Sequence, residues 1–275
     1  MNRISMIKQS EEDLSHKIVS ADVFVFAGQS NMAGRGIVCE KYPEPIEKTV
    51  AGAGYEYKAI TNPERLMPVD VTFGRDENTS WGINDGKMKT GSLVPSFINA
   101  YFSENGNIPV IGISASKGGS SVSMWQADSS ERYLEDTLNR LESCRNYLIR
   151  RKIEIRHTFL LWCQGETDGD LNTTAEEYER LTRCTFDIFV KNGVEHIFMI
   201  QIGHYNSSDD PKRYSSIINR QKEMSLKYDD ITLVSESFKT MRERGLMKDL
   251  FHYYQAAYNE VGREAGRNAA KSVRK

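Results

Sequence analysis

Two segments at opposite ends of the sequence carry residue types that together could perform nucleophilic catalysis. Ser30 lies within residues 28–32 (Gly-Gln-Ser-Asn-Met), directly after an apolar run, and Asp249 and His252 lie three residues apart near the other end. A neutral histidine can accept the proton of a serine hydroxyl when a carboxylate hydrogen-bonds its other ring nitrogen and fixes the tautomer. These residues are therefore candidates for a nucleophile, a general base and its orienting acid.

Each of these segments also has an ordinary structural explanation. Serine and aspartate are preferred helix caps, so Ser30 and Asp249 could simply begin helices, with His252 on a surface helix. A helix that begins at Ser30 would also favour negative charge beside the hydroxyl through its backbone amides and its dipole. Taken one segment at a time, the sequence leaves both interpretations open.

Two further segments could stabilise an oxyanion. Residues 117–121 (Lys-Gly-Gly-Ser-Ser), followed by Trp125, contain a glycine pair whose backbone can approach a ligand and direct an amide at it. Residues 162–168 (Trp-Cys-Gln-Gly-Glu-Thr-Asp) place Gln164 at the end of an apolar run, where its side-chain amide could donate a hydrogen bond. A tight turn and a polar loop start are the plainer explanations.

Apolar runs alternate along the chain with helical patterns, which predicts an α/β protein with helices on both faces of a parallel sheet. The expected strands are residues 21–27, 108–114, 153–163, 196–202 and 231–235, and the expected helices are residues 131–151, 176–191, 214–228 and 251–270. Ligands of such sheets bind beyond the carboxyl ends of the strands. Three of the four segments follow expected strands, so the topology should bring them together.

The length of 275 residues fits one large domain, residues 1–275. Residues 38–89 interrupt the alternating pattern, because they contain four prolines and several glycines and show weak periodicity. We expect a long loop-rich insertion there, either a functional loop system or a region of short strands that the pattern does not reveal.

The composition argues against several classes of protein. A formal charge of −2 with dispersed basic residues gives no footprint for nucleic acid. The apolar runs are strand-sized rather than membrane-spanning, and residues 1–17 lack the apolar region of a signal peptide. We therefore expect a cytoplasmic protein with reduced cysteines, although a secreted protein without its leader would look the same. No histidine or cysteine spacing is typical of a metal site.

The four segments, in this order, resemble the SGNH hydrolase superfamily, specifically its sialate O-acetylesterase and acetylxylan-esterase-like branch. The resemblance spans Gly28 to His252 and implies a flavodoxin-like three-layer α/β/α sandwich with a central, mostly parallel five-stranded sheet. It implies Ser30 as nucleophile, His252 as base and Asp249 as its orienting acid, without a cofactor. The oxyanion hole would use the amide of Ser30, an amide of the glycine pair and the Gln164 side chain, with Gly119 favoured over Gly118.

The implied activity is removal of O-acetyl groups from a carbohydrate by a serine esterase. Residues that could contact the substrate or support the site are Gln29, Asn31, Gly118, Trp125 and Glu166, and Trp125, Trp81 and Tyr205 could stack on a sugar ring. A short-chain lipid or thioester hydrolase, an acetyltransferase and a non-catalytic carbohydrate-binding protein are the alternatives on this fold. The expected partner is an acetylated carbohydrate, with neither nucleic acid nor membrane. The sequence identifies neither the sugar nor the oligomeric state.

Overall fold

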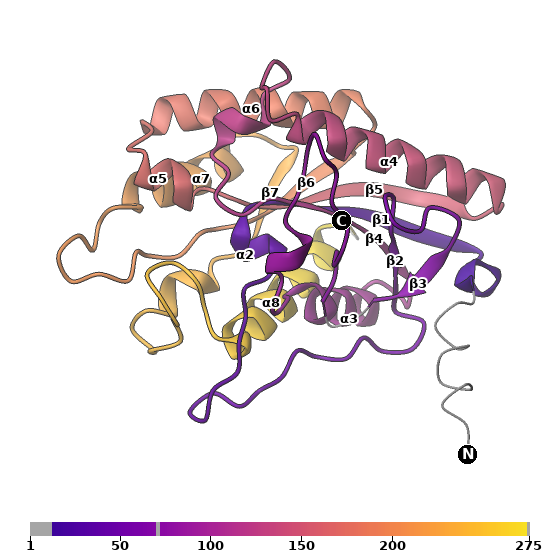
Figure 1. Cartoon of the computed structure of the whole chain (residues 1–275), viewed down its shortest axis with the longest axis horizontal. Coiled ribbons are helices and arrows are strands. Elements are labelled where there is room, and N and C mark those ends of the chain that lie inside the picture. Colours follow the sequence, from indigo (N-terminus) through magenta and orange to yellow (C-terminus); the bar gives the residue numbers. More distant parts are fainter. Residues whose placement is uncertain (1–12, 70–71, 274–275) are drawn as a thin grey trace.

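The apolar runs form the middle of a seven-stranded sheet in the computed structural model, which describes residues 13–69 and 72–273 (Figure 1). The strands, in chain order, are β1 (Ser20–Gly28), β2 (Gly54–Tyr57), β3 (Leu66–Pro68), β4 (Val110–Ser116), β5 (Glu154–Cys163), β6 (His196–Ile200) and β7 (Ile231–Ser235). Their order across the sheet is β3-β2-β4-β1-β5-β6-β7, with β1 at the centre. All neighbours pair in parallel except β2 and β3, which are antiparallel.

The expectation of five strands was too low by two. The additional strands, β2 and β3, both lie in the segment 38–89, so part of this segment is sheet rather than loop. The apolar pattern of the sequence does not reveal these strands, because they are short and because β2 carries a fully buried acidic residue, Glu56. The Glu56 carboxylate accepts a hydrogen bond from the Gly74 N–H at 2.7 Å, which ties β2 to the rest of this segment.

Helices cover both faces of the sheet, and Figure 1 shows α4 and α6 on one side and α3 and α8 on the other. The helices are α2 (Ser30–Ala33), α3 (Val94–Glu104), α4 (Tyr133–Arg150), α5 (Glu166–Asp170), α6 (Ala175–Lys191), α7 (Ser215–Lys227) and α8 (Gln255–Val273). Short 3₁₀ turns are η1 (Leu14–Lys17), η2 (Gly86–Met88), η3 (Val122–Trp125) and η4 (Ser237–Thr240). The sequence pattern missed α3, and the helix expected from residue 251 begins at Gln255 instead.

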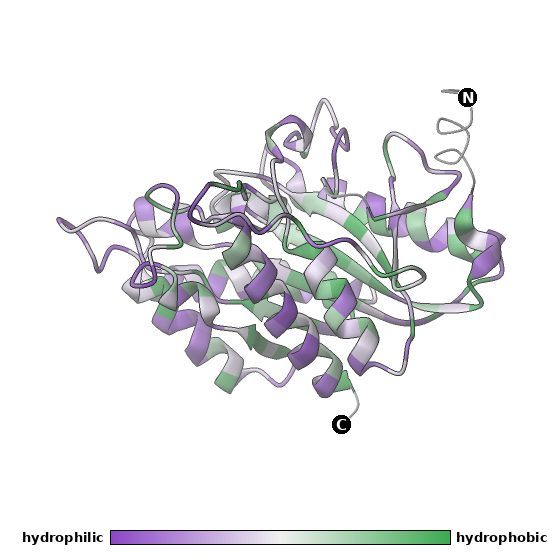
Figure 2. Cartoon of the chain, turned by 90° about the horizontal axis from the view of Figure 1, so that it is seen from below, coloured by the Kyte–Doolittle hydropathy of each residue, from purple (hydrophilic) through white to green (hydrophobic). Residues whose placement is uncertain are grey.

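The central strand β1 has a core on each face. Successive side chains of a strand point to opposite faces, so Val23 and Val25 pack beneath α4 and α6 while Phe24 and Phe26 pack against α3 and α8. Because both faces are covered, the strand is a continuous apolar run rather than an alternating one. Figure 2 shows the result, with hydrophobic strands inside and hydrophilic outer faces on the helices.

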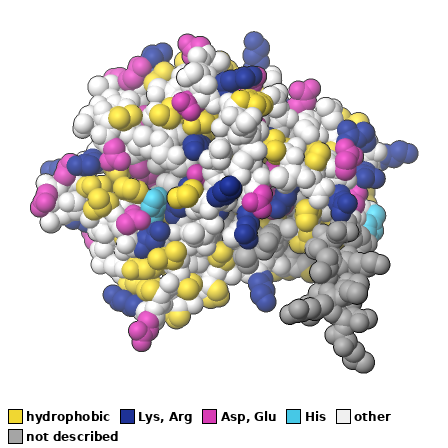
Figure 3. Space-filling model, in the orientation of Figure 1, with side chains coloured by type: hydrophobic (Ala, Val, Ile, Leu, Met, Phe, Trp, Pro, Cys, Tyr) yellow, Lys and Arg dark blue, Asp and Glu magenta, His cyan; other side chains and the backbone are white. Residues whose placement is uncertain are grey.

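On the face seen in Figure 3, basic and acidic side chains are intermixed, so neither sign of charge forms a large patch there. Among the helices in the described part of the chain, none combines the length and the apolar character needed to traverse a bilayer.

Candidate active site

The end of β1 fixes the position of Ser30. Gly28 has a φ of 131°, and a Cβ placed on it would lie 2.1 Å from the carbonyl oxygen of Cys163, so only glycine lets β1 approach β5 this closely. The next N–H, of Gln29, donates to the same carbonyl at 2.9 Å. The chain then turns into α2, which is a single helical turn that starts at Ser30. A dipole contribution from so short a helix is small, and the backbone amides are the stronger feature.

Ser30, His252 and Asp249 form a continuous line of hydrogen bonds. The Ser30 Oγ lies 2.9 Å from Nε2 of His252, and Nδ1 of His252 lies 2.9 Å from Oδ2 of Asp249. The other oxygen of Asp249 accepts the backbone N–H groups of His252 at 2.7 Å and Phe251 at 3.0 Å. The carboxylate therefore holds both the ring and the backbone of the segment. The structure brings these three residues together, with Ser30 at the start of α2 and with Asp249 and His252 on a loop before α8 rather than on a helix.

The electrostatics of the pair favour a neutral histidine beside an ionised aspartate. Burial lowers the pKa of His252 below its usual value, and this outweighs the opposite effect of the Asp249 carboxylate. Burial alone would raise the pKa of Asp249, but the hydrogen bonds from Phe251 and His252 together lower it. A neutral imidazole with a carboxylate on Nδ1 presents an unprotonated Nε2 to the serine hydroxyl, which is the form a general base requires.

The loop that carries His252 is tied to its surroundings by several hydrogen bonds. Two backbone hydrogen bonds join the ends of the loop. The N–H of Tyr254 donates to the Leu246 carbonyl at 2.9 Å, and the N–H of Lys248 donates to the His252 carbonyl at 3.0 Å. Asn31 binds the loop from the other side, because its Nδ2 donates to the Phe251 carbonyl at 3.0 Å. The residue after Ser30 therefore also helps to hold the His252 loop.

Backbone N–H groups are available where an oxyanion would form. Within the described residues, the N–H groups of Ser30, Gly118 and Gly119 have no acceptor. A Cβ on Gly118 would lie 2.6 Å from Nη2 of Arg35, so Gly118 packs directly against that guanidinium. Gly119 has a φ of 73° and open space around its Cα. A left-handed backbone of this kind favours glycine and turns the chain back at the pocket.

The structure does not bring Gln164 into the pocket, so its expected role as an oxyanion donor has no geometric support. Gln164 is fully buried, and its Nε2 donates to the Ser120 carbonyl at 3.0 Å and to the Asp168 carboxylate. These two bonds occupy both hydrogens of the amide. The sequence pattern located the amide at the strand end but could not show that Asp168, four residues later, would bind it.

Glu166 and Asn31 form a polar layer behind Ser30. Both are buried, and Asn31 Nδ2 donates to Oε1 of Glu166 while the Tyr258 hydroxyl donates to Oδ1 of Asn31 at 2.6 Å. Oε2 of Glu166 is buried without a partner in the described residues, and burial raises the pKa of Glu166 to about 7. This carboxyl group therefore titrates near neutral pH.

Ser30 and His252 open into a pocket of about 410 Å³ whose lining residues are mostly of polar types. One side of the wall is an ion pair in which Nη2 of Arg35 binds both oxygens of Asp85, at 2.8 and 2.7 Å. The complete lining comprises Gln29, Ser30, Arg35, Asp85, Met88, Lys117, Gly118, Gly119, Glu166, Thr167, Asp170, Phe251 and His252. Sequence reasoning missed Arg35, Asp85, Met88, Lys117, Thr167, Asp170 and Phe251. The partners Arg35 and Asp85 lie far apart in the sequence, and Asp85 lies in the aperiodic segment, so no local signal marks them.

The aromatic residues expected to stack on a sugar lie elsewhere. Trp125 is fully buried in the core against Trp162, and its Nε1 donates to Oγ of Ser120 at 3.0 Å, so it supports the glycine loop from behind. Tyr205 is buried against Tyr214, and Trp81 is half-exposed beneath the guanidinium of Arg132. None of the three lines the pocket.

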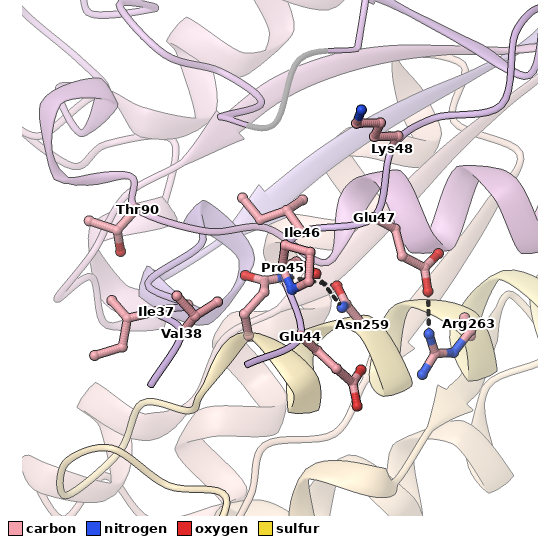
Figure 4. A pocket seen from close by; sticks show the side chains of 12 residues that line it. Ile37, Val38, Glu44, Pro45, Ile46, Glu47, Lys48, Thr90, Asn259 and Arg263 are labelled. Atoms are coloured by element: carbon pink, nitrogen blue, oxygen red, sulfur yellow. Dashed lines mark hydrogen bonds and ion pairs between the residues drawn. The ribbon is translucent and has the colours of Figure 1, made fainter. Parts of the chain in front are cut away.

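A larger cavity, of about 710 Å³, lies apart from the Ser30 pocket and is closed by the segment 36–48 and α8 (Figure 4). Asn259 donates to the Pro45 carbonyl at 2.8 Å, and Arg263 pairs with Glu47, so α8 holds the segment at two points. Its lining, in the described part of the chain, contains no serine, cysteine or histidine. In the described residues no group of three or more His, Cys, Asp and Glu side chains is arranged to hold a metal ion.

Solved structures share this fold. An Arabidopsis thaliana protein aligns with a TM-score of 0.64 and 19% identity, over 92% of this chain and 98% of that chain. NanS aligns with a TM-score of 0.62 and 13% identity, over 93% of this chain and 98% of that chain. Axe2, an acetylxylan esterase from Geobacillus stearothermophilus, aligns with a TM-score of 0.52 and 15% identity, over 92% and 95% of the two chains. The mostly parallel α/β fold is thus shared with these structures.

The family comparison covers most of the chain. No curated protein sequence matches it. The model of a family described as "Carbohydrate esterase, sialic acid-specific acetylesterase" matches residues 20–271, a range that contains Ser30, Asp249 and His252. The chain therefore belongs to this carbohydrate esterase family, the sialic acid-specific acetylesterases.

Proposed function

We propose that this protein is a serine esterase that removes O-acetyl groups from a carbohydrate, with Ser30 as nucleophile, His252 as general base and Asp249 as the group that orients the histidine. The observation that carries the proposal is the line of hydrogen bonds from Ser30 through His252 to Asp249, each 2.9 Å long, at the wall of a pocket. Membership of a carbohydrate esterase family supports the reaction class.

In the first half of the reaction, the Ser30 Oγ attacks the carbonyl carbon of the acetyl ester while Nε2 of His252 takes the hydroxyl proton. The oxyanion that forms accepts hydrogen bonds from free backbone N–H groups, those of Ser30 and Gly119. The tetrahedral intermediate then breaks its bond to the sugar oxygen. His252 returns the proton to that oxygen, so the sugar leaves as an alcohol and Ser30 remains acetylated.

In the second half, His252 removes a proton from water, and the resulting hydroxide attacks the acetyl carbonyl carbon on Ser30. The same amides bind the second oxyanion. Collapse breaks the ester bond to Ser30, the histidine returns its proton to the serine Oγ, and acetic acid leaves. The sum is one ester and one water converted to one alcohol and one acetic acid, which ionises to acetate and a proton. Asp249 stabilises the imidazolium in both halves without taking the proton.

The pocket lining favours a hydroxyl-rich leaving group. Arg35, Asp85, Lys117 and Asp170 line the same pocket as Ser30 and carry both donors and acceptors, which suits a sugar better than an alkyl chain. The apolar contribution comes mainly from Met88 and Phe251. A substrate with a small acyl group and a polar alcohol fits this distribution.

The test is hydrolysis of 4-nitrophenyl acetate and 4-nitrophenyl octanoate by the wild type, Ser30→Ala and Ser225→Ala. Ser225 is a matched control, because it lies on α7 and its Oγ bonds only the Lys222 carbonyl. We expect rapid acetate release that falls by ~10⁶-fold in Ser30→Ala and stays unchanged in Ser225→Ala, with little release from octanoate. Release of acetate from O-acetylated sialic acid and O-acetylated xylo-oligosaccharides then identifies the sugar.

Three outcomes contradict the proposal. Hydrolysis that survives in Ser30→Ala would remove the serine from the mechanism. Preference for octanoate over acetate would replace the carbohydrate by a lipid-like substrate. A wild type that binds acetylated sugars in calorimetry but releases no acetate would be a binding protein on this fold.

A further inference from the structure

We infer that the side-chain amide of Gln29, rather than that of Gln164, is the third donor of the oxyanion hole. The inference rests on the proposed function, since it concerns the oxyanion that forms when Ser30 attacks the ester. No covalent bond to Gln29 is made or broken. Its Nε2 donates one hydrogen bond to the negative oxygen and releases it when the intermediate collapses.

The first argument is that Gln164 has no hydrogen left to donate. Its Nε2 is engaged by the Ser120 carbonyl and the Asp168 carboxylate, and the whole residue is buried. Turning the amide over would place its Oε1 against the Ser120 carbonyl, and two acceptors repel each other. Gln164 also lies outside the pocket lining. Its amide therefore holds the glycine loop, through Ser120, and cannot reach a substrate.

The second argument is that Gln29 is held in one orientation with its nitrogen free. Its Oε1 accepts the backbone N–H groups of Gly165 at 3.0 Å and Thr167 at 3.3 Å and a longer contact from Nε2 of Gln164 at 3.4 Å. These donors fix which end of the amide is the oxygen, because a backbone N–H cannot pair with an NH₂ group. In the described residues Nε2 of Gln29 donates to no acceptor, and Gln29 lines the pocket that contains Ser30.

The third argument is that the surroundings hold this amide still. Gln29 is only 3% exposed, and its own N–H is anchored on the Cys163 carbonyl at the end of β5. Its side chain is anchored at the start of α5 by Gly165 and Thr167. A donor fixed from both ends needs no reorganisation when charge develops, and this is the property that makes oxyanion donors effective.

The experiment compares Gln29→Glu, Gln29→Met and Gln164→Met with the wild type on 4-nitrophenyl acetate, with Ser30→Ala as reference. Glutamate keeps an oxygen for the Gly165 and Thr167 N–H groups but removes the donor, so it separates donation from anchoring. Methionine removes both without adding charge. Gln164→Met is the matched control, because it deletes the neighbouring amide, whose Nε2 contacts Gln29 Oε1 at 3.4 Å but which does not line the pocket. Thermal unfolding is measured for each variant.

We expect both Gln29 variants to lose ~10²–10³ in kcat with KM within about threefold of the wild type, as for a donor used only in the transition state. We expect Gln164→Met to lower Tm, because Asp168 and the Ser120 carbonyl lose their donor, with kcat within about tenfold. If Gln29→Met does not fold, Gln29→Glu carries the test, since it retains the anchoring oxygen.

Two results overturn the inference while leaving the esterase intact. One is a kcat within about threefold of wild type in Gln29→Glu. The other is a loss in Gln164→Met as large as in the Gln29 variants at unchanged Tm. A wild type without Ser30-dependent hydrolysis is a separate failure, because it overturns the proposed function and with it this inference.

Discussion

Ser30 and His252 meet across the pocket from two regions that are built differently. Ser30 follows the central strand of the sheet, is 6% exposed, and is positioned by the contact of Gly28 with β5. His252 lies on an irregular loop, and the side chain of its partner Asp249 is 40% exposed. Ser30 is placed by the packing of the core, whereas His252 is placed by a small number of hydrogen bonds.

The difference implies that the two halves should respond differently to substitution. A position set by close packing of backbone is insensitive to the loss of any one polar contact, because many contacts define it. A loop set by a few hydrogen bonds shifts when one is removed, and a shift of about 1 Å between reacting groups can cost 10²-fold in rate.

The largest effect is expected from Asp249→Asn. The asparagine Oδ1 can still accept the N–H groups of Phe251 and His252, so the loop should hold, but its NH₂ would stabilise the wrong tautomer of the histidine. We expect a loss of ~10²–10⁴ in kcat at neutral pH, below the full effect of a buried aspartate because Asp249 is partly exposed. Steady-state kinetics on 4-nitrophenyl acetate measure it, with Asp209→Asn on an exposed loop as control. A rate within threefold of wild type would mean that Asp249 does not orient the base.

A smaller effect is expected from Asn31→Ala, which removes the hydrogen bond from Asn31 Nδ2 to the Phe251 carbonyl. We expect a loss of ~10–10² in kcat. The free energy of unfolding should also fall by about 1–3 kcal/mol, because the Tyr258 hydroxyl loses its acceptor. Tyr258→Phe removes only the bond to Asn31 Oδ1 and should leave kcat within about threefold. If both variants lowered kcat equally, Asn31 would act through the core and not through the His252 loop.

The smallest effect is expected in the pH dependence. His252 must be neutral to act as a base, and its pKa is lowered by burial, so kcat/KM should rise with pH through an apparent value below ~6.5. Glu166 has a pKa of about 7, so above that pH it adds a negative charge behind the site of the oxyanion. We expect a decline of ~3-fold there. Glu166→Gln should follow the wild type at pH 6 and lack the decline at pH 8. An unchanged decline in the variant would assign it to another group.

Much of the fold and the pairing of Ser30 with His252 could be predicted, because these depend on regular patterns. Parallel strands buried on both faces are continuous apolar runs, and residues after their carboxyl ends converge at one edge of the sheet. The segment 38–89 could not be assigned, since the four residues of β2 and the three of β3 are too short for any period to emerge.

The errors at the site share a physical cause. The sequence indicates that Gln164 and Trp125 lie near the pocket, but only three-dimensional contacts decide which acceptor an amide meets or which face an indole buries. Gln164 binds Asp168 and Ser120, and Trp125 packs on Trp162. The Arg35–Asp85 pair joins positions 50 residues apart, and no local pattern encodes such a contact.

The distance along the chain between Ser30 and His252, 222 residues, has a consequence for when the protein becomes active. A nascent chain can assemble β1, β4 and β5 and present Ser30 while the segment that carries the base is still unsynthesised. Helix α8 follows His252 by three residues and packs against α3, so docking of this last helix also delivers the histidine. During refolding, esterase activity should therefore return with the docking of α8 and later than the secondary structure of the sheet.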